Sequence, residues 1–271
     1  MRNFVHDIVI RQTLQRQIGK RLWPLFKFLA TILNLSRDYW IVDLRSNNPK
    51  VSNLKKLGKY DYISVQKFGT ERKISRIKQN RKELHLGKPT KKVELLASLL
   101  KREFPDRTIS GICHGVRSGV ENNWLLSQLP RGSKIIGTDI HSDITGIPNC
   151  IKWDFHEIKR EWENNFDFVY CNSLDQSNRP LIAIYSWLKS LKIDSGILFL
   201  DIGRHTGKNG NTLLDPFCIE PELAPFFLLK HFKGCTLDGV HFPFPGDFRT
   251  TILELKRGSD LELINVELPV D

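Results

Sequence analysis

The chain has 271 residues, of which 40% are apolar and 26% charged, as is ordinary for a soluble globular protein with one large domain or a domain and an appendage. Its five cysteines are odd in number and form no C-x-x-C pair, which excludes a disulfide framework and a cysteine zinc site and favours a reducing, cytoplasmic location. The histidines also lack the spacing of metal ligands, so the sequence predicts no metal site.

The net charge of +11 is unevenly distributed along the chain. Residues 1–102 contain 24 Lys and Arg against 7 Asp and Glu, whereas the remaining residues contain 17 against 23. This asymmetry predicts a basic N-terminal extension over residues 1–90 and a mildly acidic catalytic or binding domain over residues 91–271. The extension favours phosphate-rich partners, such as membrane headgroups, nucleic acid or an anionic glycolipid, although its Lys- and Arg-rich stretch over residues 50–92 is also typical of a solvated face.

The first part of the extension has the pattern of an amphipathic helix. In "RQTLQRQIGKRLWPLFKFLATILNL" apolar residues recur at helical spacing, and Lys and Arg gather on the other side. The apolar run over residues 22–35 is interrupted by Lys27 and is shorter than the roughly 20 residues that span a membrane. It has no small-residue cleavage site behind it, which argues against a signal peptide. Two interpretations stay open: residues 1–35 lie on an anionic membrane surface, at the inner face of the membrane, or the helix packs on the main domain.

From residue 91 the pattern becomes a regular alternation of helices and strands. This alternation predicts an α/β fold with a Rossmann-like, doubly wound and mostly parallel sheet. The last two strands leave no room for a helix between them, so we expect an antiparallel C-terminal strand pair. The expected helices are 91–104, 118–129, 158–165 and 179–192, and the expected strands are 107–113, 133–140, 149–155, 166–174, 196–203, 235–244 and 248–257.

Ligands of such sheets bind outside the carboxyl ends of the strands, so the residues that end each strand form the candidate site. The first strand leads into "SGICHGVRSG", a loop with Gly111, Gly115 and Gly119, before a helix whose N-terminal N–H groups suit a carboxylate or phosphate. The second strand ends at Asp139, 20 residues beyond Gly119, where a carboxylate can accept hydrogen bonds from ribose hydroxyls. Together the loop and Asp139 indicate a cofactor that contains adenosine.

The third and fourth strands also end in polar residues. After the third strand, Asp154 offers an acceptor for an adenine amino group, and the neighbouring Phe155 offers a ring for stacking. After the fourth, "CNSLDQS" follows the apolar "FDFVY", so that Asn172, Ser173 and Asp175 face the reacting end of a cofactor. The alternative is that these residues cap the next helix, and both can hold at once.

The order of these pieces resembles a class I S-adenosylmethionine-dependent methyltransferase. The segment "WLKSLKIDSGILFL" and the terminal antiparallel strands are also similar to that family. More narrowly, "GICHGVRSGVE", "IIGTDI", "IKWDFHEI" and "FDFVYCNSLDQS" resemble a little-characterised bacterial branch of these enzymes. The resemblance covers about residues 108–257 and does not extend to the basic N-terminal part.

The resemblance implies S-adenosyl-L-methionine as the cofactor, with one departure at the glycines. The family has an acidic residue just ahead of them and G-x-G spacing, whereas here Ser110 stands ahead and the glycines are spaced by four. The carboxylate that usually meets the cofactor's amino group is missing from that place, and His114 or Arg117 is a candidate for the cofactor's own carboxylate. The implied contacts are Gly115 and Gly119 with the methionine part, Asp139 with the ribose, Asp154 and Phe155 with the adenine, and Asn172 and Ser173 with the methionine end near the acceptor.

Methyl transfer from a sulfonium is an in-line displacement, so holding the nucleophile in line with the methyl carbon supplies most of the catalysis. A hydroxyl acceptor benefits from a general base, for which Asp175 and His205 are candidates, with a surface-loop histidine as the favoured alternative for His205. The expected acceptor is a small molecule, a saccharide or a lipid-linked glycan, and the basic extension favours an anionic or membrane-borne one, such as a saccharide on a lipid carrier. The segment "LLDPFCIEPELAPFFLLKHF" is either an apolar lid over this acceptor or a packed connection.

Three other functions stay open from the sequence. A nucleic-acid methyltransferase would use the basic extension to bind phosphates, but no RNA-binding module or base-modifying motif is recognisable. A non-enzymatic membrane-surface protein with a degenerate methyltransferase fold would explain the altered glycine loop. An NAD-dependent oxidoreductase fits the loop and Asp139 alone, but the antiparallel final strands and "CNSLDQS" disfavour it.

Overall fold

The computed structural model describes residues 50–51, 90–140, 142–203, 217–219, 221, 223–244 and 250–264. The chain divides into two compact units, Met1–Ser46 and Asn47–Asp271, and every described residue belongs to the second. The amphipathic helix expected within residues 1–35 and most of the Lys- and Arg-rich stretch lie outside the described residues. The domain boundary at residue 90 and the membrane surface therefore stay predictions. Within the described part, no helix is long and apolar enough to cross a membrane.

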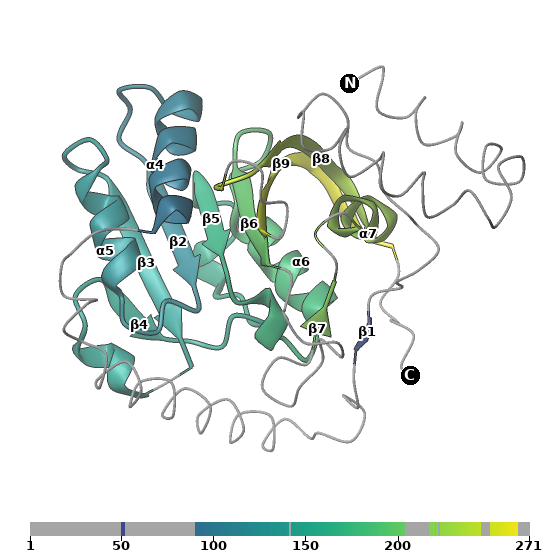
Figure 1. Cartoon of the computed structure of the whole chain (residues 1–271), viewed down its shortest axis with the longest axis horizontal. Helices are drawn as coiled ribbons and strands as arrows, with labels where there is room; N and C mark the ends of the chain where they lie inside the picture. Colours follow the sequence, from purple (N-terminus) through teal and green to yellow (C-terminus); the bar gives the residue numbers. More distant parts are fainter. Residues whose placement is uncertain are drawn as a thin grey trace, which may run out of the picture. The chain divides into compact units, whose positions relative to one another are not determined.

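The core of the described unit is a seven-stranded sheet with the strand order β4-β3-β2-β5-β6-β9-β8 (Figure 1). The five strands from β4 to β6 are parallel, β9 runs antiparallel to β6, and β8 pairs antiparallel with β9. The predicted doubly wound, mostly parallel sheet with an antiparallel C-terminal pair is therefore confirmed. The strands are β2 (Ser110–His114), β3 (Lys134–Asp139), β4 (Cys150–Lys152), β5 (Phe168–Cys171), β6 (Ile197–Gly203), β8 (Phe232–His241) and β9 (Thr250–Leu263). A separate pair joins β1 (Lys50–Val51) to β7 (Phe217–Cys218) in antiparallel register.

Helices cover both faces of this sheet (Figure 1). Side chains alternate between the two faces along each strand, so neighbouring residues of β2 contact the helices on opposite faces of the sheet. Cys113 belongs to the core cluster that contains α4 (Lys91–Glu103) and α5 (Val120–Ser127). The next residue, His114, stacks on Trp187 of α6 (Pro180–Ser190), with ring centroids 5.5 Å apart. The two layers follow directly from the near-continuous apolar runs of β5 and β6, which are buried on both sides.

The helix α4 shows why the local sequence forms these elements. Its buried residues Val93, Leu96, Ala97 and Leu100 recur at the i, i+3, i+4 and i+7 positions of one helical face. The helix interior contains no Gly or Pro, and the segment ends before Pro105, which cannot continue a helix. The predicted helix over residues 91–104 is thus confirmed, and its apolar face closes one side of the candidate site.

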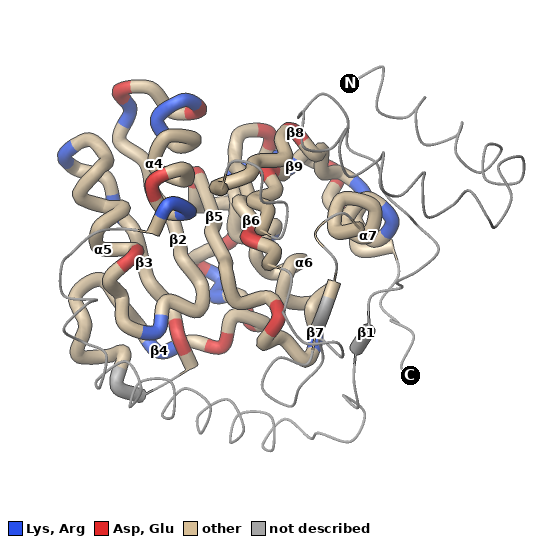
Figure 2. Tube along the Cα trace, in the orientation of Figure 1, with Lys and Arg blue, Asp and Glu red and all other residues tan. Residues whose placement is uncertain are grey.

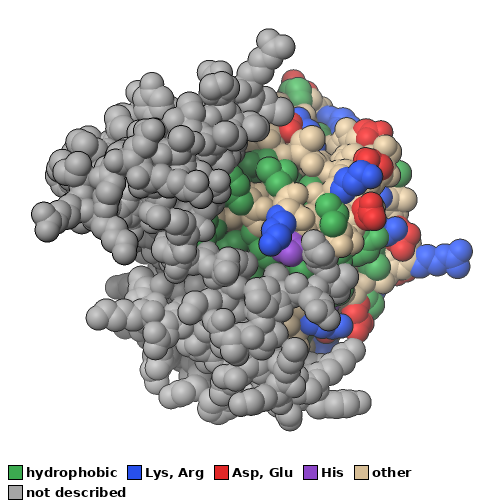
Figure 3. Space-filling view, turned by 90° about the vertical axis from the view of Figure 1, so that its right-hand side faces the viewer, with side chains coloured by type: hydrophobic (Ala, Val, Ile, Leu, Met, Phe, Trp, Pro, Cys, Tyr) green, Lys and Arg blue, Asp and Glu red, His purple; other side chains and the backbone are tan. Residues whose placement is uncertain are grey.

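Two segments differ from the sequence-based expectation. The stretch 158–165 was expected as a helix but forms only the short 3-10 turn η3 (Arg160–Trp162), because Asn164 adopts a left-handed backbone with φ of 57°. The segment ahead of the last strands contains α7 (Ala224–His231), in which Phe227 is buried and Leu229 is 46% exposed. The side of the molecule on which α7 lies shows apolar side chains at the surface beside Lys and Arg (Figure 3). The described part of the segment "LLDPFCIEPELAPFFLLKHF" thus forms the short strand β7 and the packed helix α7.

The amino ends of β2 and β5 are joined by one buried carboxylate, Asp167. Its Oδ2 accepts from the Ser110 N–H at 2.7 Å, and its Oδ1 accepts from Arg107 at 2.6 Å and from Lys192 at 2.9 Å. Burial acts to raise the pKa of Asp167, but the Ser110 N–H and the two cations outweigh it, so the pKa lies below its ordinary value. Asp167 thus stabilises the sheet at the end opposite to the candidate site.

We expect Asp167→Asn to lower the free energy of unfolding by about 1–3 kcal/mol at pH 7, because an acceptor oxygen and its charge are both lost in a buried place. Since the folded-state pKa is lowered, this contribution is complete above the unfolded pKa of about 3.9 and is lost as the pH falls through the folded value. Urea unfolding at pH 7 and in acid measures both effects. The control is Asp194→Asn, at an exposed position whose φ of 59° asparagine tolerates. Equal losses from both substitutions would contradict the assignment.

Candidate functional site

The carboxyl ends of the parallel strands lie along one edge of the sheet, at the lower side of Figure 1. The strand order changes direction at β2: β3 and β4 follow on one side of it, and β5 and β6 on the other. Open α/β sheets bind their ligands at this point of divergence. Acidic and basic positions both occur along this edge (Figure 2).

The loop from β2 to α5 is built on left-handed backbone. Gly115, Arg117 and Gly119 have φ values of 73°, 48° and 66°. A side chain on Gly115 would overlap that of Ser173, which lies beneath it, and the Gly115 N–H donates to the Thr138 carbonyl at 2.8 Å. Only glycine combines this φ with so close a neighbour. The loop is therefore held down on the ends of β3 and β5.

The middle residue of the loop contacts the predicted ribose acid. The Arg117 N–H donates to Asp139 Oδ2 at 2.9 Å, so the carboxylate at the end of β3 is held against the loop. Left-handed residues at alternate positions give the backbone that a G-x-G-x-G segment would have, with Arg117 in the central place. Gly119 instead serves packing, because a Cβ there would lie 2.6 Å from Ile147 and 2.9 Å from Cys150 Sγ. The loop therefore has left-handed backbone at every second residue from Gly115 to Gly119, although its glycines are spaced by four.

Ser110 does not take the place, next to the cofactor, that the sequence analysis gave to the residue ahead of the glycines. Ser110 begins β2, at the opposite end of the strand, where it binds Asp167 rather than facing a ligand. The residue two places before Gly115 is Cys113, which is buried and apolar in character. The carboxylate at this site comes from Glu121, in the first turn of α5, a residue that the sequence analysis did not single out. A polar residue in the first helical turn after a glycine loop was the signal that could have found it.

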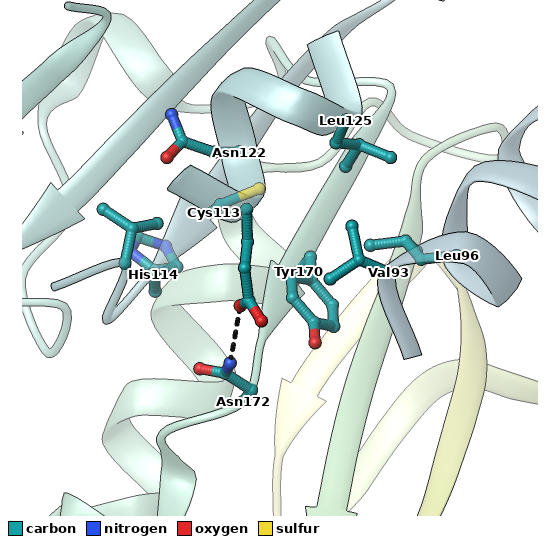
Figure 4. Close-up of a pocket in the computed structure, with 10 residues that line it drawn as sticks. Val93, Leu96, Cys113, His114, Asn122, Leu125, Tyr170 and Asn172 are labelled. Atoms are coloured by element: carbon teal, nitrogen blue, oxygen red, sulfur yellow. Dashed lines mark hydrogen bonds between the residues drawn. The ribbon is translucent and has the colours of Figure 1, made fainter. Parts of the chain in front are cut away.

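Glu121 lies in a pocket between α4, α5 and the carboxyl ends of β2 and β5 (Figure 4). The pocket is small, and its empty space of about 270 Å³ includes open solvent at its mouth. Asn172 Nδ2 donates to Glu121 Oε2 at 3.2 Å across it. The pocket is lined by Val93, Leu96, Cys113, His114, Val116, Glu121, Asn122, Leu125, Tyr170 and Asn172.

The electrostatics of this pocket favour a cationic group. Burial raises the pKa of Glu121, and the charge of Asp201 raises it further against the opposing charges of Lys92 and Arg117. Asp201 is itself paired, since Lys92 Nζ lies 2.8 Å from its Oδ2 and Tyr170 donates to it at 3.3 Å. Glu121 makes no ion pair with any described residue. A buried carboxylate without a direct counter-ion is stabilised by a positively charged ligand.

The predicted adenine side lies beyond the end of β4. The backbone N–H of Trp153 donates to the Asp139 carbonyl at 2.9 Å, which places Asp154 beside the end of β3. The ring of Phe155 is 7% exposed and packs against Trp187, with centroids 5.5 Å apart, and its contact with the adenine stays a prediction. Asp154 instead contacts His156, which the sequence analysis did not connect to it.

The predicted residues after β5 separate into different roles. Asn172 lines the pocket, whereas Ser173 is 5% exposed and its hydroxyl faces the Gly115 carbonyl at 3.4 Å, so it supports the loop from below. Asp175 lies half-buried in the short turn η4 (Leu174–Gln176), which precedes α6; the N-cap residue of α6, Arg179, makes no side-chain capping hydrogen bond. His205 lies outside the described residues. No group of three or more His, Cys, Asp or Glu in the described part is arranged to hold a metal ion.

Comparison with known proteins defines the class of fold. No protein-family model matches this chain, and no curated protein does. Among solved structures, it is similar to 1,6-didemethyltoxoflavin-N1-methyltransferase from Burkholderia thailandensis, which holds 1,6-didemethyltoxoflavin and S-adenosylhomocysteine. That match has 13% identity and a TM-score of 0.51, and covers 81% of this chain and 98% of that chain. At this identity the likeness shows the fold alone, and the expected fold of a class I S-adenosylmethionine-dependent methyltransferase is confirmed.

Other solved structures are similar over a smaller part of the chain. The trans-methyltransferase CalH, in complex with S-adenosylhomocysteine, is 18% identical, with a TM-score of 0.46 and coverage of 60% of this chain and 55% of that chain. The [4+2]-cyclase SpnF is 14% identical, with a TM-score of 0.46 and coverage of 60% and 80%. The matched region spans about half of the CalH chain and 51% of the CurJ carbon methyltransferase. A shared fold does not determine the reaction, so the chemistry is argued from the site.

We expect Gly115→Ala to lower the free energy of unfolding by about 1–3 kcal/mol, because alanine is strained at a φ of 73° and its Cβ would overlap Ser173. Thermal or urea unfolding measures the loss. Gly146→Ala is the matched control, since a Cβ at Gly146 meets nothing within 4 Å. If the two variants are equally stable, the loop is not held on Ser173 as the structure shows.

Proposed function

We propose that this protein transfers the methyl group of S-adenosylmethionine to a small-molecule acceptor. The observation that carries the proposal is the left-handed loop after β2, whose Arg117 N–H holds the Asp139 carboxylate at the end of β3. It stands at the point where the strand order reverses in a sheet of the methyltransferase fold. The Burkholderia thailandensis protein of that fold holds both a small heterocyclic molecule and S-adenosylhomocysteine, which supports the choice of cofactor and of acceptor class.

The residues at the strand ends fit the parts of this cofactor. We assign Asp139 to the ribose hydroxyls and Asp154 to the adenine amino group, because these carboxylates lie on adjacent strand ends. The loop from Gly115 to Arg117 offers close backbone approach to the methionine part. When bound, the cofactor supplies a methyl group on a positively charged sulfur. The protein's own part is to hold that group, exclude water and present the acceptor in line.

Glu121 fits the α-ammonium of the methionine part. Its carboxylate faces the pocket beside Asn172 and has no ion pair among the described residues, so an ammonium group would supply the missing counter-charge. The family resemblance led us to look for an acid at Ser110, which begins β2, and the residue near the end of β2 is the buried Cys113. The carboxylate function is therefore assigned to the first turn of α5 in place of the end of β2.

The acceptor end is assigned to the turn that follows β5. Asp175 in η4 is the proposed general base for a hydroxyl acceptor, and His205 keeps this role as a prediction outside the described residues. A saccharide or a lipid-linked glycan remains within the proposed acceptor class. A search with radiolabelled S-adenosylmethionine against extracts separated into small-molecule, lipid and nucleic-acid fractions tests it, and methylation confined to nucleic acid would contradict it.

We expect calorimetric titration to show saturable binding of S-adenosylmethionine and S-adenosylhomocysteine, and none of NAD. Asp139→Asn should weaken S-adenosylhomocysteine about tenfold or more, because asparagine retains an oxygen for the Arg117 N–H but loses the charge and the second acceptor. Asp260→Asn, at an exposed position of β9, is the control. Unchanged affinity would remove Asp139 from the ribose site, and a folded wild-type protein that binds neither ligand would overturn the proposed function.

Glu121→Gln separates the ammonium contact from the rest of the cofactor. We expect about tenfold weaker binding of S-adenosylhomocysteine and unchanged binding of 5′-methylthioadenosine, which lacks the amino-acid part. Because burial and Asp201 raise the pKa of Glu121, wild-type affinity for S-adenosylhomocysteine should fall in mild acid as the carboxylate gains a proton, whereas the variant should lack this step. The matched control is Glu94→Gln on the exposed face of α4. Equal weakening of both ligands would argue against the ammonium contact.

A further inference from the structure

A second buried polar cluster lies next to the strand ends and consists of Asp154, His156 and Ser177. His156 Nδ1 lies 2.6 Å from Asp154 Oδ1, and His156 Nε2 lies 2.7 Å from Ser177 Oγ. The order carboxylate, imidazole, hydroxyl is that of a serine hydrolase triad. However, Ser177 is 0% exposed and His156 is 4% exposed, so an acyl substrate has no access to the hydroxyl. The free end of this cluster is therefore the carboxylate and not the serine.

The hydrogen bonds of the cluster define where each proton lies. An ionised Asp154 can only accept, so at 2.6 Å His156 Nδ1 carries a proton and donates it to Asp154 Oδ1. In a neutral imidazole Nε2 is then an acceptor, so the Ser177 hydroxyl donates to it, while Ser177 Oγ accepts from the Arg179 N–H at 3.1 Å. Burial lowers the pKa of His156 in spite of the adjacent carboxylate, which is consistent with a neutral ring.

The cluster makes hydrogen bonds to only one of the two carboxylate oxygens of Asp154. Its Oδ1 accepts two hydrogen bonds from His156, one from Nδ1–H and one from the backbone N–H at 3.0 Å. Its Oδ2 accepts none from any described residue, and the side chain is 16% exposed. Burial acts to raise the pKa of Asp154, but the bonds and charge of His156 outweigh it, so the pKa lies below its ordinary value. Asp154 therefore presents one charged, open oxygen in a fixed orientation.

The backbone around the cluster is fixed by α6. Ser186 Oγ donates to the His156 carbonyl at 2.8 Å, and Trp187 Nε1 donates to the Phe155 carbonyl at 2.9 Å. The turn is closed by the Glu157 N–H, which donates to the Asp154 carbonyl at 3.0 Å. Because both side chain and backbone are held, the orientation of Asp154 exists before a ligand binds, which is how a recognition group gains specificity.

We propose that His156, supported by Ser177, is a positioning residue that directs Asp154 Oδ2 to the exocyclic amino group of the cofactor's adenine. The inference rests on the proposed function, since it concerns the same cofactor. His156 does not touch the ligand; it acts by occupying Oδ1 so that only Oδ2 meets the purine. Ser177 directly follows η4, so the same imidazole also connects the purine side of the site to the turn that carries Asp175.

The test compares S-adenosylhomocysteine with S-inosylhomocysteine, in which a carbonyl oxygen replaces the amino group. We expect the wild-type protein to prefer the amino ligand at least tenfold in Kd. Asp154→Asn should reverse this preference, because an asparagine whose Oδ1 is held by His156 must place its Nδ2 at the open position, where it donates to the carbonyl oxygen. In the double variant with Asp154→Asn and His156→Phe, the preference should no longer be reversed, since the introduced amide would then be free to turn. A merely structural histidine would not move this ratio.

Ser177→Ala is the milder variant and should reduce the wild-type preference by a few fold while the protein stays folded. Its matched control is Ser190→Ala, which also removes a buried serine hydroxyl of the α6 region, one that bonds only the Ser186 carbonyl. Imidazole nitrogen spectra of the wild-type protein should show a neutral His156 with its proton on Nδ1 at pH 7. This measurement keeps the proposal testable if the His156 variant fails to fold.

The outcomes separate this inference from the proposed function. If the wild-type protein binds neither ligand, both fall. If it binds the two ligands equally, or if the preference persists in both the His156 and the Ser177 variants, the positioning role is overturned and the cofactor assignment stands. A protonated ring, or a ring with its proton on Nε2, also contradicts the proposal.

Discussion

The close contact of Gly115 with Ser173 is the constraint on which the site depends. A side chain has no room there, and the left-handed φ of 73° lets the chain turn over the end of β5 immediately after β2. From that turn the Arg117 N–H reaches Asp139, and two residues after Gly119 Glu121 enters the pocket. The positions of the loop, the acid of β3 and the carboxylate of α5 all follow from this one close approach.

The two faces of the sheet divide the proposed recognition of one cofactor. On the face covered by α4 and α5, Glu121 lies in a small pocket that suits the methionine end. On the face covered by α6, His156 and Ser177 hold Asp154 at the purine end. The strand β5 lies between these regions, and the turn that follows it contributes Asn172 to the first and Ser177 to the second. A ligand that spans the sheet edge would therefore contact both layers.

The buried carboxylates show which acids are structural and which are prepared for a ligand. Asp167 accepts from a backbone N–H and two cations, and its pKa is lowered in spite of burial. Glu121 accepts from an amide and has no ion pair among the described residues, so burial prevails and its pKa is raised. Asp167 lies just ahead of β5 and Glu121 in the first turn of α5. Only Glu121 has no ion pair among the described residues, although Lys92, Thr90 and Arg117 oppose the rise of its pKa. Such imbalance is typical of functional sites, because stability alone would remove it.

The sequence by itself determined the architecture and the strand ends. Periodic apolar residues predicted α4, apolar runs predicted the parallel strands, and the absence of a helix between the last two strands predicted their antiparallel pairing. The places of Asp139 and Asn172 followed as well, because the end of a buried strand is visible as a change from apolar to polar residues. These features depend on near neighbours in the chain, which is why local spacing was sufficient.

Only the tertiary structure decided which side chains work together. Glu121 meets Asn172 across 51 residues of chain, and His156 meets Ser177 across 21, and no local pattern encodes such pairs. Packing against α6 buries the ring of Phe155, and the backbone of Arg117 is left-handed although arginine seldom adopts that conformation. Contacts of this kind are set by how the elements pack, since each depends on the distance and direction between segments that are far apart in the sequence.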